Sequence, residues 1–445
     1  MILKVKNLKN VGGVVKAPPS KSYTHRAVII ASLANGYSKL FDPLVSEDTL
    51  SSIKACEAFG AEIAISNKGG EETAQTLDIE GTTSLHNYSK EAIDLMNSGT
   101  TLRIMTSVAG LADNETIFTG DDSLKTRPME MLLEAIKPLG GNARSIPKNG
   151  KPPIAIKPGF IGGKTAIDGS VSSQFISSIL IAGAISKKGI NLEVKGDFIS
   201  KSYVAMTLDV MEKFGIIIET DLFTKHEDCD IVDKKCFSTY FSIKPQKYMA
   251  TDYVVEGDYS SASYLLGAIA ILGGEIKIKN LFKDSKQGDK FILDILKQMG
   301  AKIEIAEDFV TLKSNGNLKG IAIDLHNAPD LLPTVSVLAS LATGTTTITG
   351  VKHARYKETD RIAKCAEELK KLGCELEEKD DGMVIKGGIH SGKVKSHDDH
   401  RIAMAFTLAG LKHEIAIENG NVFDVSFPNF IEAMKEIGIE LELLE

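Results

Sequence analysis

The most informative stretch of the sequence is Pro18-Pro19-Ser20-Lys21-Ser22-Tyr23-Thr24-His25-Arg26. Its hydroxyl side chains precede an apolar run at residues 27–34, and hydroxyls in that place are typical helix N-caps. A helix N-terminus offers unpaired N–H groups and a partial positive charge, so Lys21 and Arg26 would complete an anion-binding site there. A capped helix with two solvated basic residues explains the same stretch, which therefore does not decide between the two interpretations by itself.

A second pattern occurs six times along the chain. An amphipathic run ends in a large apolar residue and a glycine, and an alternating run follows it. Glycine is the common residue directly after a helix, and alternation indicates a strand. We therefore expect a helix to end and a strand to follow at Gly60, Gly140, Gly215, Gly300, Gly373 and Gly438.

Helices that are apolar on nearly every side alternate with these amphipathic helices. They are expected at residues 27–34, 102–111, 175–184, 262–272, 334–342 and 402–411. A helix that is apolar all round is buried, whereas an amphipathic helix lies outside. Each unit is thus predicted to run strand, buried helix, strand, outer helix, strand, strand. Such a small unit could not cover its apolar helix alone, so the six units of this α/β chain must pack together.

One division between domains is expected in the middle of the chain. The joint between the third and fourth units is polar and irregular at residues 226–235 and again at 244–247. We place the division near residues 245–257, which leaves three units on each side.

Polar side chains gather at the starts of these helices. Capping explains one Ser, Thr, Asp or Asn per helix. It does not explain the basic and amide side chains at the same places, which are Lys21, Arg26, Arg103, Gln174, His400 and Arg401. The starts of the outer helices add Arg127, Ser200, Tyr203, Lys357, Glu358 and Arg361.

If the units repeat in space, these helix starts point toward one region that would attract a small polyanion. Two carboxylates there, Asp330 and Glu358, and the ammonium groups of Lys21 and Lys357 are candidates for proton transfer. Salt bridges between units are the structural alternative for the same charges.

Composition excludes several classes of protein. The chain has 445 residues and a net charge of -7, which argues against a general nucleic-acid binder. No apolar run is long enough for a membrane span, and the first ten residues alternate like a strand rather than a secretory signal. Five scattered cysteines without a CxxC pair argue against a disulfide framework and favour a reducing cytoplasm.

One run in the sequence contains residue types that can ligate a metal. The run His397-Asp398-Asp399-His400 offers ligands, but nothing near it has the spacing of a zinc or non-haem iron site. We therefore expect no metal.

Seven short motifs follow one another along the chain. They are Pro19-Ser20-Lys21-Ser22 with Arg26, Asn97-Ser98-Gly99-Thr100 with Arg103, Arg127-Pro128-Met129, Ser172-Ser173-Gln174, Glu256-Gly257-Asp258-Tyr259-Ser260-Ser261-Ala262-Ser263, Lys357-Glu358-Thr359-Asp360-Arg361 and Asp399-His400-Arg401. Their order resembles the 5-enolpyruvylshikimate-3-phosphate synthase family, over essentially the whole chain. Each motif alone is moderately specific, whereas the ordered set is highly specific.

The resemblance implies two domains, each of three βαβαββ units in an inside-out α/β barrel, with helix N-termini facing an interdomain cleft. Residues 18–254 would form the shikimate-phosphate domain, and residues 1–17 with 255–445 the second. It implies transfer of the enolpyruvyl group of phosphoenolpyruvate to the 5-hydroxyl of shikimate 3-phosphate, through a tetrahedral adduct and with loss of phosphate. The expected protein is a cytoplasmic monomer that needs no cofactor and binds neither nucleic acid nor membrane.

The resemblance also assigns residues. The shikimate 3-phosphate site would contain Ser22, Arg26, Ser172, Ser173, Gln174, Ser200, Tyr203, Asp330 and Lys357. The phosphoenolpyruvate site would contain Lys21, Gly99, Arg103, Arg127, Gln174, Arg361, His400 and Arg401. Asp330 would take the proton of the attacking hydroxyl, and Glu358 would exchange the proton at the methylene carbon. Lys21 would lie near the bridging oxygens, and Lys357 completes the catalytic set.

Two positions depart from the family pattern. Val425 stands where many members have a Lys, and His353 stands where an Asn is often found. Both changes are expected to tune affinity rather than remove activity.

Two alternative functions fit the residues of this chain less well. A sister transferase acting on a UDP-amino sugar would carry a reactive Cys within residues 121–127, where this chain has none, and would lack the Lys-Glu-Thr-Asp-Arg set. A polyanion-binding or RNA-end-processing relative would not need Asp330 and Glu358 beside Lys357.

Overall fold

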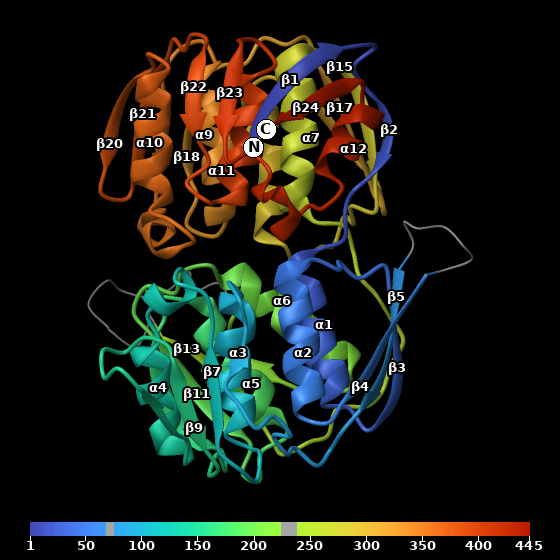
Figure 1. Ribbon diagram of the computed structural model, residues 1–445, viewed down its shortest axis with the longest axis vertical. Coiled ribbons are helices and arrows are strands. Elements are labelled where there is room, and N and C mark those ends of the chain that lie inside the picture. The colour runs from blue at the N-terminus through green and yellow to red at the C-terminus, as the bar shows by residue number, and fades with distance from the viewer. Residues whose placement is uncertain (68–74, 224–237) are drawn as a thin grey trace. The chain divides into compact units, whose positions relative to one another are not determined.

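The computed structural model describes residues 1–67, 75–223 and 238–445. These residues form two compact units, of which unit 1 is Met1–Ser20 with Glu256–Glu445 and unit 2 is Lys21–Val255 (Figure 1). Each unit has its own hydrophobic core. Both contain helices and mixed sheets, which confirms the α/β class. The polar joint at residues 226–235, with Cys229 and Cys236, lies outside the described residues.

Unit 2 contains three four-stranded sheets. The first is β14 (Tyr253–Val254), β3 (Gly36–Phe41), β5 (Gln75–Gly81) and β4 (Glu62–Asn67). The second is β6 (Ile93–Asp94), β7 (Thr116–Thr119), β9 (Ile154–Lys157) and β8 (Asn142–Ser145). The third is β10 (Gly163–Asp168), β11 (Ile190–Lys195), β13 (Thr239–Ile243) and β12 (Glu219–Thr220). In each sheet the first pair is parallel and the other pairs are antiparallel.

Unit 1 also contains three four-stranded sheets, each with one parallel pair. The first is β16 (Lys302–Ile305), β17 (Phe309–Ser314), β15 (Gly274–Lys279) and β2 (Gly13–Lys16). The second is β18 (Ala322–Asp324), β19 (Thr346–Thr349), β21 (Gly382–Gly387) and β20 (Glu375–Lys379). The third is β22 (Gly392–Lys395), β23 (Ile415–Glu418), β1 (Ile2–Leu8) and β24 (Ile439–Leu444).

The N-terminal strands therefore complete sheets built from the C-terminal half of the chain. Figure 1 shows β1, in blue, beside the red strands β23 and β24. The chain leaves unit 1 and re-enters it at adjacent points. The Ser20 N–H donates to the Glu256 carbonyl at 2.8 Å, and the Asp258 N–H donates to the Pro18 carbonyl at 2.8 Å.

Six helices are buried along almost their whole length, as the apolar runs predicted. They are α1 (Lys21–Ser32), α3 (Gly99–Ala109), α5 (Ser173–Ala184), α7 (Tyr259–Leu272), α9 (Leu332–Ser340) and α11 (His400–Ala409). In unit 1, α7, α9 and α11 pack on one another, and in unit 2 α3 packs on α5. None of the described helices is long and apolar enough to cross a membrane.

The remaining helices alternate with the buried ones. They are α2 (Glu47–Ala58), α4 (Glu130–Ile136), α6 (Lys201–Lys213), α8 (Ile292–Gln298), α10 (Arg361–Lys371) and α12 (Phe430–Glu436). Short 3-10 turns are η1 (Leu124–Thr126), η2 (Lys137–Leu139), η4 (Gly288–Phe291), η5 (Pro329–Leu331), η6 (Lys352–Tyr356) and η7 (Val422–Val425). Cys56, Cys365 and Cys374 are buried free thiols.

The repeated glycines all take the left-handed conformation that was expected of them. Their φ angles are 98° at Gly60, 85° at Gly140, 85° at Gly215, 114° at Gly300, 85° at Gly373 and 83° at Gly438. Five stand directly after the C-cap residue of an outer helix, and Gly140 is the C-cap of η2, which extends α4. The sequence pattern therefore located the ends of all six outer helices.

Gly438 provides a test of this constraint. An added Cβ at Gly438 would lie 2.0 Å from the Lys9 carbonyl oxygen, whereas one at Gly388 would have nothing within 4 Å. Both residues have positive φ, so each substitution by Ala costs roughly 1–2 kcal/mol of backbone strain. Gly438→Ala should lower the midpoint of urea unfolding clearly further than Gly388→Ala. Equal midpoints for the two variants would contradict this account of the helix end.

Candidate active site

The predicted site residues fall into two sets, one in each unit, and every member lies just before a helix or within its first two turns. Unit 1 holds Asp330, Lys357, Glu358, Arg361, His400 and Arg401. Unit 2 holds Lys21, Ser22, Arg26, Gly99, Arg103, Arg127, Ser172, Ser173, Gln174, Ser200 and Tyr203.

Arg361 is the centre of the unit 1 cluster. Its side chain is 1% exposed and donates to three carboxylates. Nη1 donates to Asp330 Oδ1 at 2.7 Å and Nη2 to Glu358 Oε2 at 2.6 Å. Nε donates to Asp399 Oδ2 at 2.7 Å. Burial alone would lower the pKa of Arg361, but Asp399, Glu358 and Asp330 together raise it above its usual range. The guanidinium is therefore a permanent charge that fixes the starts of three helical segments.

Asp330 also forms ion pairs with two further cations. Arg401 Nη2 donates to Asp330 Oδ2 at 3.0 Å, and Lys357 Nζ lies 3.4 Å from Oδ1. Asp330 and Glu358 are thus held at fixed positions by the same guanidinium, that of Arg361.

Two more buried carboxylates belong to this cluster. Asp399 is the N-cap of α11 and accepts from the Arg401 backbone N–H at 2.9 Å. Asp289, on η4, accepts from the hydroxyl of Ser260 at the start of α7. Burial and the nearby charge of Asp330 raise the pKa of Asp289. His400 is buried as the first residue of α11.

His353 lies on η6 beside this cluster and is 7% exposed. Its ring stacks edge-on against His326, with centroids 6.1 Å apart. Burial, followed by the charge of Lys357 and the ring of His326, lowers the pKa of His353 to about 3. The imidazole is therefore neutral at neutral pH and offers one donor and one acceptor, as an amide does.

In unit 2, Arg103 joins the starts of α3 and α5. Its Nη1 donates to Gln174 Oε1 at 2.6 Å, and the guanidinium lies 5.2 Å from the Phe175 ring centroid. Gln174 Nε2 in turn donates to Thr100 Oγ1, on α3, at 2.8 Å. Ser172, the N-cap of α5, is 3.4 Å from Arg103 Nη1. An amide oxygen and a hydroxyl therefore help to orient this cation.

Arg127 is held against Gly99. Its Nη2 donates to Asn97 Oδ1 in the turn before α3. A Cβ built on Gly99 would lie 2.4 Å from Arg127 Nη1, so a larger residue there would displace the guanidinium. This contact gives a physical reason for the glycine in the Asn97-Ser98-Gly99-Thr100 motif.

Arg26 joins α1 to α6 and is 1% exposed. Its Nε donates to Thr207 Oγ1 at 2.7 Å, and its two terminal nitrogens donate to the carbonyls of Ser22 and Tyr203. Burial lowers the pKa of Arg26 to about 10. Ser200, before α6, has a φ of 53°, and Ser173 is buried in the first turn of α5. Lys21, at the start of α1, pairs with Asp48.

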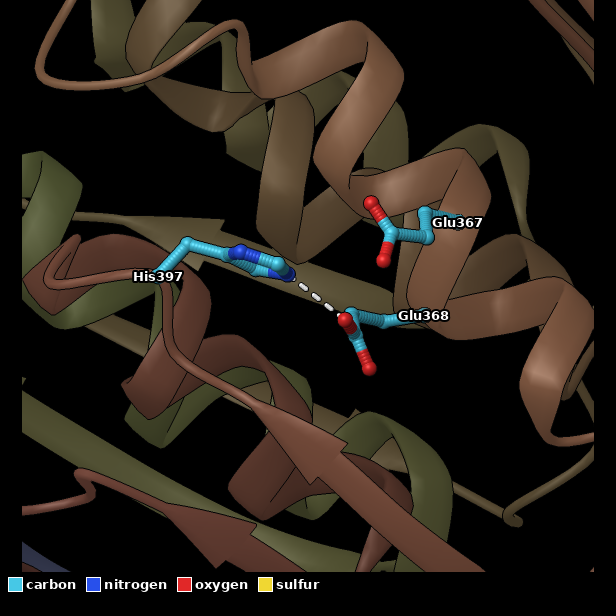
Figure 2. Close-up of side chains that lie close together, drawn as sticks. All are labelled: Glu367, Glu368 and His397. Carbon is cyan, nitrogen blue, oxygen red and sulfur yellow. Dashed lines mark hydrogen bonds and ion pairs between the residues drawn. The ribbon is translucent and has the colours of Figure 1, made fainter.

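The possible metal ligands at residues 397–400 have different partners in the structure. Asp399 binds Arg361, whereas His397 Nε2 is 2.6 Å from Glu368 Oε1 on α10 (Figure 2). Within the described residues, the side chains that do converge are Glu367, Glu368 and His397. Lys371 and the Lys395 backbone N–H also donate to Glu368. We assign these contacts a structural role, because they tie α10 to the turn before α11.

The family model described as EPSP synthase (3-phosphoshikimate 1-carboxyvinyltransferase) matches residues 5–434. The chain belongs to the EPSP synthase family. Relatives named 3-phosphoshikimate 1-carboxyvinyltransferase from Methanobrevibacter smithii and Methanothermobacter thermautotrophicus are 64% and 53% identical, each over the whole of both chains. A solved EPSP synthase from Acinetobacter baumannii has a TM-score of 0.78 and 27% identity, covering 100% of this chain and 99% of that one. The resemblance expected from the seven motifs is confirmed.

Three carboxylates that contact site residues of this EPSP synthase family member were not identified from the sequence. Asp399 lies in the Asp399-His400-Arg401 motif, and its position as a helix N-cap was the signal that could have identified it. Asp48 lies in the first turn of α2, where an acidic residue is ordinary. Asp289 lies in a short turn, and nothing in its local sequence distinguishes it from an exposed acid.

His353 should make the stability of this EPSP synthase family member depend on pH. An unfolded His binds a proton near pH 6.5, whereas the folded pKa is about 3. Between these values the unfolded chain binds more protons, so the free energy of unfolding falls as the pH falls. His353→Asn removes this term, so its urea midpoint should fall less than that of the wild type between pH 6.5 and 4. His390→Asn, at an exposed histidine, is the control, and an unchanged pH slope in His353→Asn would contradict the burial argument.

Proposed function

We propose that this enzyme moves the enolpyruvyl group of phosphoenolpyruvate to the 5-hydroxyl of shikimate 3-phosphate and releases phosphate. The observation that carries the proposal is the pairing of Asp330 and Glu358 on one buried guanidinium, Arg361, within a chain that matches the family from residue 5 to 434. Addition followed by elimination needs one group to accept a proton and another to deliver one, and both must keep their positions.

The proposed domains are residues 18–254 and residues 1–17 with 255–445, each an inside-out α/β barrel of three βαβαββ units. The element order of the six sheets supports this arrangement. Their helix N-termini are proposed to face an interdomain cleft. Shikimate 3-phosphate would bind Ser22, Arg26, Ser172, Ser173, Gln174, Ser200, Tyr203, Asp330 and Lys357. Phosphoenolpyruvate would bind Lys21, Gly99, Arg103, Arg127, Gln174, Arg361, His400 and Arg401.

The first half of the reaction makes a tetrahedral adduct. Asp330 takes the proton of the 5-hydroxyl as its oxygen bonds to C2 of phosphoenolpyruvate. Glu358 gives a proton to the methylene carbon, which becomes a methyl group. In the second half, Glu358 takes a proton back from that methyl group as the bond from C2 to the phosphate oxygen breaks. The proton held by Asp330 passes to the released phosphate, which returns both carboxyl groups to their starting states. Lys21 and Lys357 balance the negative charge on the oxygens during both steps.

Both substrates are multiply charged anions that repel each other. A charge-assisted hydrogen bond contributes roughly 1.5–3 kcal/mol, so several are needed to hold the two anions together. Planar guanidinium groups suit carboxylate and phosphate because they donate two parallel hydrogen bonds. The arginines at helix starts meet this need. We further propose a cytoplasmic monomer that uses no metal or organic cofactor and binds neither nucleic acid nor membrane.

The deciding measurement is phosphate release from phosphoenolpyruvate with shikimate 3-phosphate, and separately with a UDP-amino sugar. The proposal predicts release only with shikimate 3-phosphate. Release only with the UDP-amino sugar would contradict it.

Glu358→Gln tests the proton role. The amide keeps the size of the side chain but cannot deliver a proton, so kcat should fall by roughly 10²–10⁴-fold while shikimate 3-phosphate still binds. Glu367→Gln on α10 is the matched control, because Glu367 pairs with Lys364 and Lys371 away from Arg361. Unchanged turnover in Glu358→Gln would remove Glu358 from this role.

Gly99→Ala tests the contact with Arg127. The added methyl group would displace the guanidinium, so the KM for phosphoenolpyruvate should rise by about 10-fold or more, since a weakened charge-assisted bond costs roughly 1.5 kcal/mol. The Kd of shikimate 3-phosphate, measured by calorimetry, should change little and serves as the internal control. A KM that does not move would show that Arg127 is not needed for this substrate.

A further inference from the structure

A chain of buried polar side chains runs through unit 2 from Lys21 to the start of α3. Lys21 Nζ donates to Asp48 Oδ2 at 2.8 Å, and the other oxygen, Oδ1, lies 3.5 Å from His25 Nε2. On the far side of the ring, His25 Nδ1 is 2.8 Å from Ser52 Oγ. Ser52 Oγ is 2.7 Å from Thr101 Oγ1, which is 2.7 Å from the Oγ of Ser98, the N-cap of α3.

The contact between His25 Nε2 and Asp48 Oδ1 gives these hydrogen bonds a direction. A lone pair on Nε2 would face the lone pairs of the carboxylate at 3.5 Å, so the proton belongs on Nε2. With a neutral ring, Nδ1 then accepts from the Ser52 hydroxyl, and Ser52 Oγ accepts from the Thr101 hydroxyl. Ser98 Oγ accepts from the Thr101 N–H and donates to Thr101 Oγ1.

Burial makes these contacts significant. The side chains of Lys21 and Asp48 are 13% and 10% exposed, and that of His25 is 0% exposed. Burial alone would raise the pKa of Asp48, but the charge of Lys21 and the ring of His25 hold it well below its usual range. The carboxylate is therefore charged at all ordinary pH values. It replaces water as the partner of the Lys21 ammonium and holds that group in one position.

We propose that Asp48, supported by His25, is a positioning residue for Lys21. It fixes the ammonium at the start of α1 before the substrates arrive. The chain of hydroxyl groups connects this ion pair to the start of α3 beside Gly99. The inference rests on the proposed role of Lys21 in enolpyruvyl transfer. Asp48 acts through Lys21 and is not itself given a contact with a substrate.

The proposed effect of Asp48 on catalysis is to orient the Lys21 side chain. A lysine side chain has several rotatable bonds, and ordering it during the reaction would add to the barrier. The ion pair with Asp48 orders it in advance. If this is the whole role of Asp48, its removal should matter only while Lys21 is present.

A double-mutant cycle tests that condition. Asp48→Asn, Lys21→Ala and the double variant are assayed by phosphate release from phosphoenolpyruvate and shikimate 3-phosphate. Asp48→Asn should lower kcat by about 10²-fold, the cost of a misplaced group, with little change in the KM for shikimate 3-phosphate. The double variant should be no slower than Lys21→Ala alone. Glu47→Gln, the exposed neighbouring acid on α2, is the control and should keep wild-type turnover.

Independent, multiplicative losses in the double variant would overturn the inference, as would full turnover in Lys21→Ala. If Asp48→Asn does not fold, Ser52→Ala takes its place, because it removes only the hydroxyl that donates to His25. Its loss of kcat, about 10-fold, must disappear in the Lys21→Ala background, and a loss that persists there would overturn the inference equally. An inactive wild-type enzyme would instead contradict the proposed function.

Discussion

The organisation of unit 1 depends on one buried guanidinium. Arg361 binds Asp330, Glu358 and Asp399, which lie on η5, just before α10 and just before α11. Removing one partner of a buried ion pair leaves an uncompensated charge and costs roughly 3–5 kcal/mol, so the cluster is stable only as a whole. This constraint holds the two carboxylates of the proposed chemistry at fixed positions.

Unit 2 meets a different requirement at its own helix starts. Arg103 and Arg127 are oriented by the amide oxygens of Gln174 and Asn97, and Arg26 is oriented by carbonyls and a hydroxyl. Lys21 is paired with the carboxylate of Asp48, and the proposed mechanism requires that this lysine be placed accurately as well as charged.

The sequence allowed the repeated parts of the fold to be predicted because they follow local rules. The glycines after outer helices need positive φ, and the apolar helices need burial, so both patterns are visible in short windows. The insertion of β1 between β23 and β24 depends on partners more than 400 residues away, which no local window contains. Family motifs contained Arg361 and Glu358, and the pattern of helix starts indicated Asp330. Neither pointed to Asp48 or Asp289, whose partners are brought near only by folding. The roles of all these residues stay predictions.

The central claim is that transfer proceeds by protonation and deprotonation of the methylene carbon in a fixed site. The most direct measurement is the NMR spectrum of the product formed in D₂O from unlabelled substrates. Addition and elimination predict deuterium in the enolpyruvyl methylene group, because the intermediate methyl group gains a deuteron and then loses one of its three hydrogens. A product without deuterium at that carbon would contradict the account.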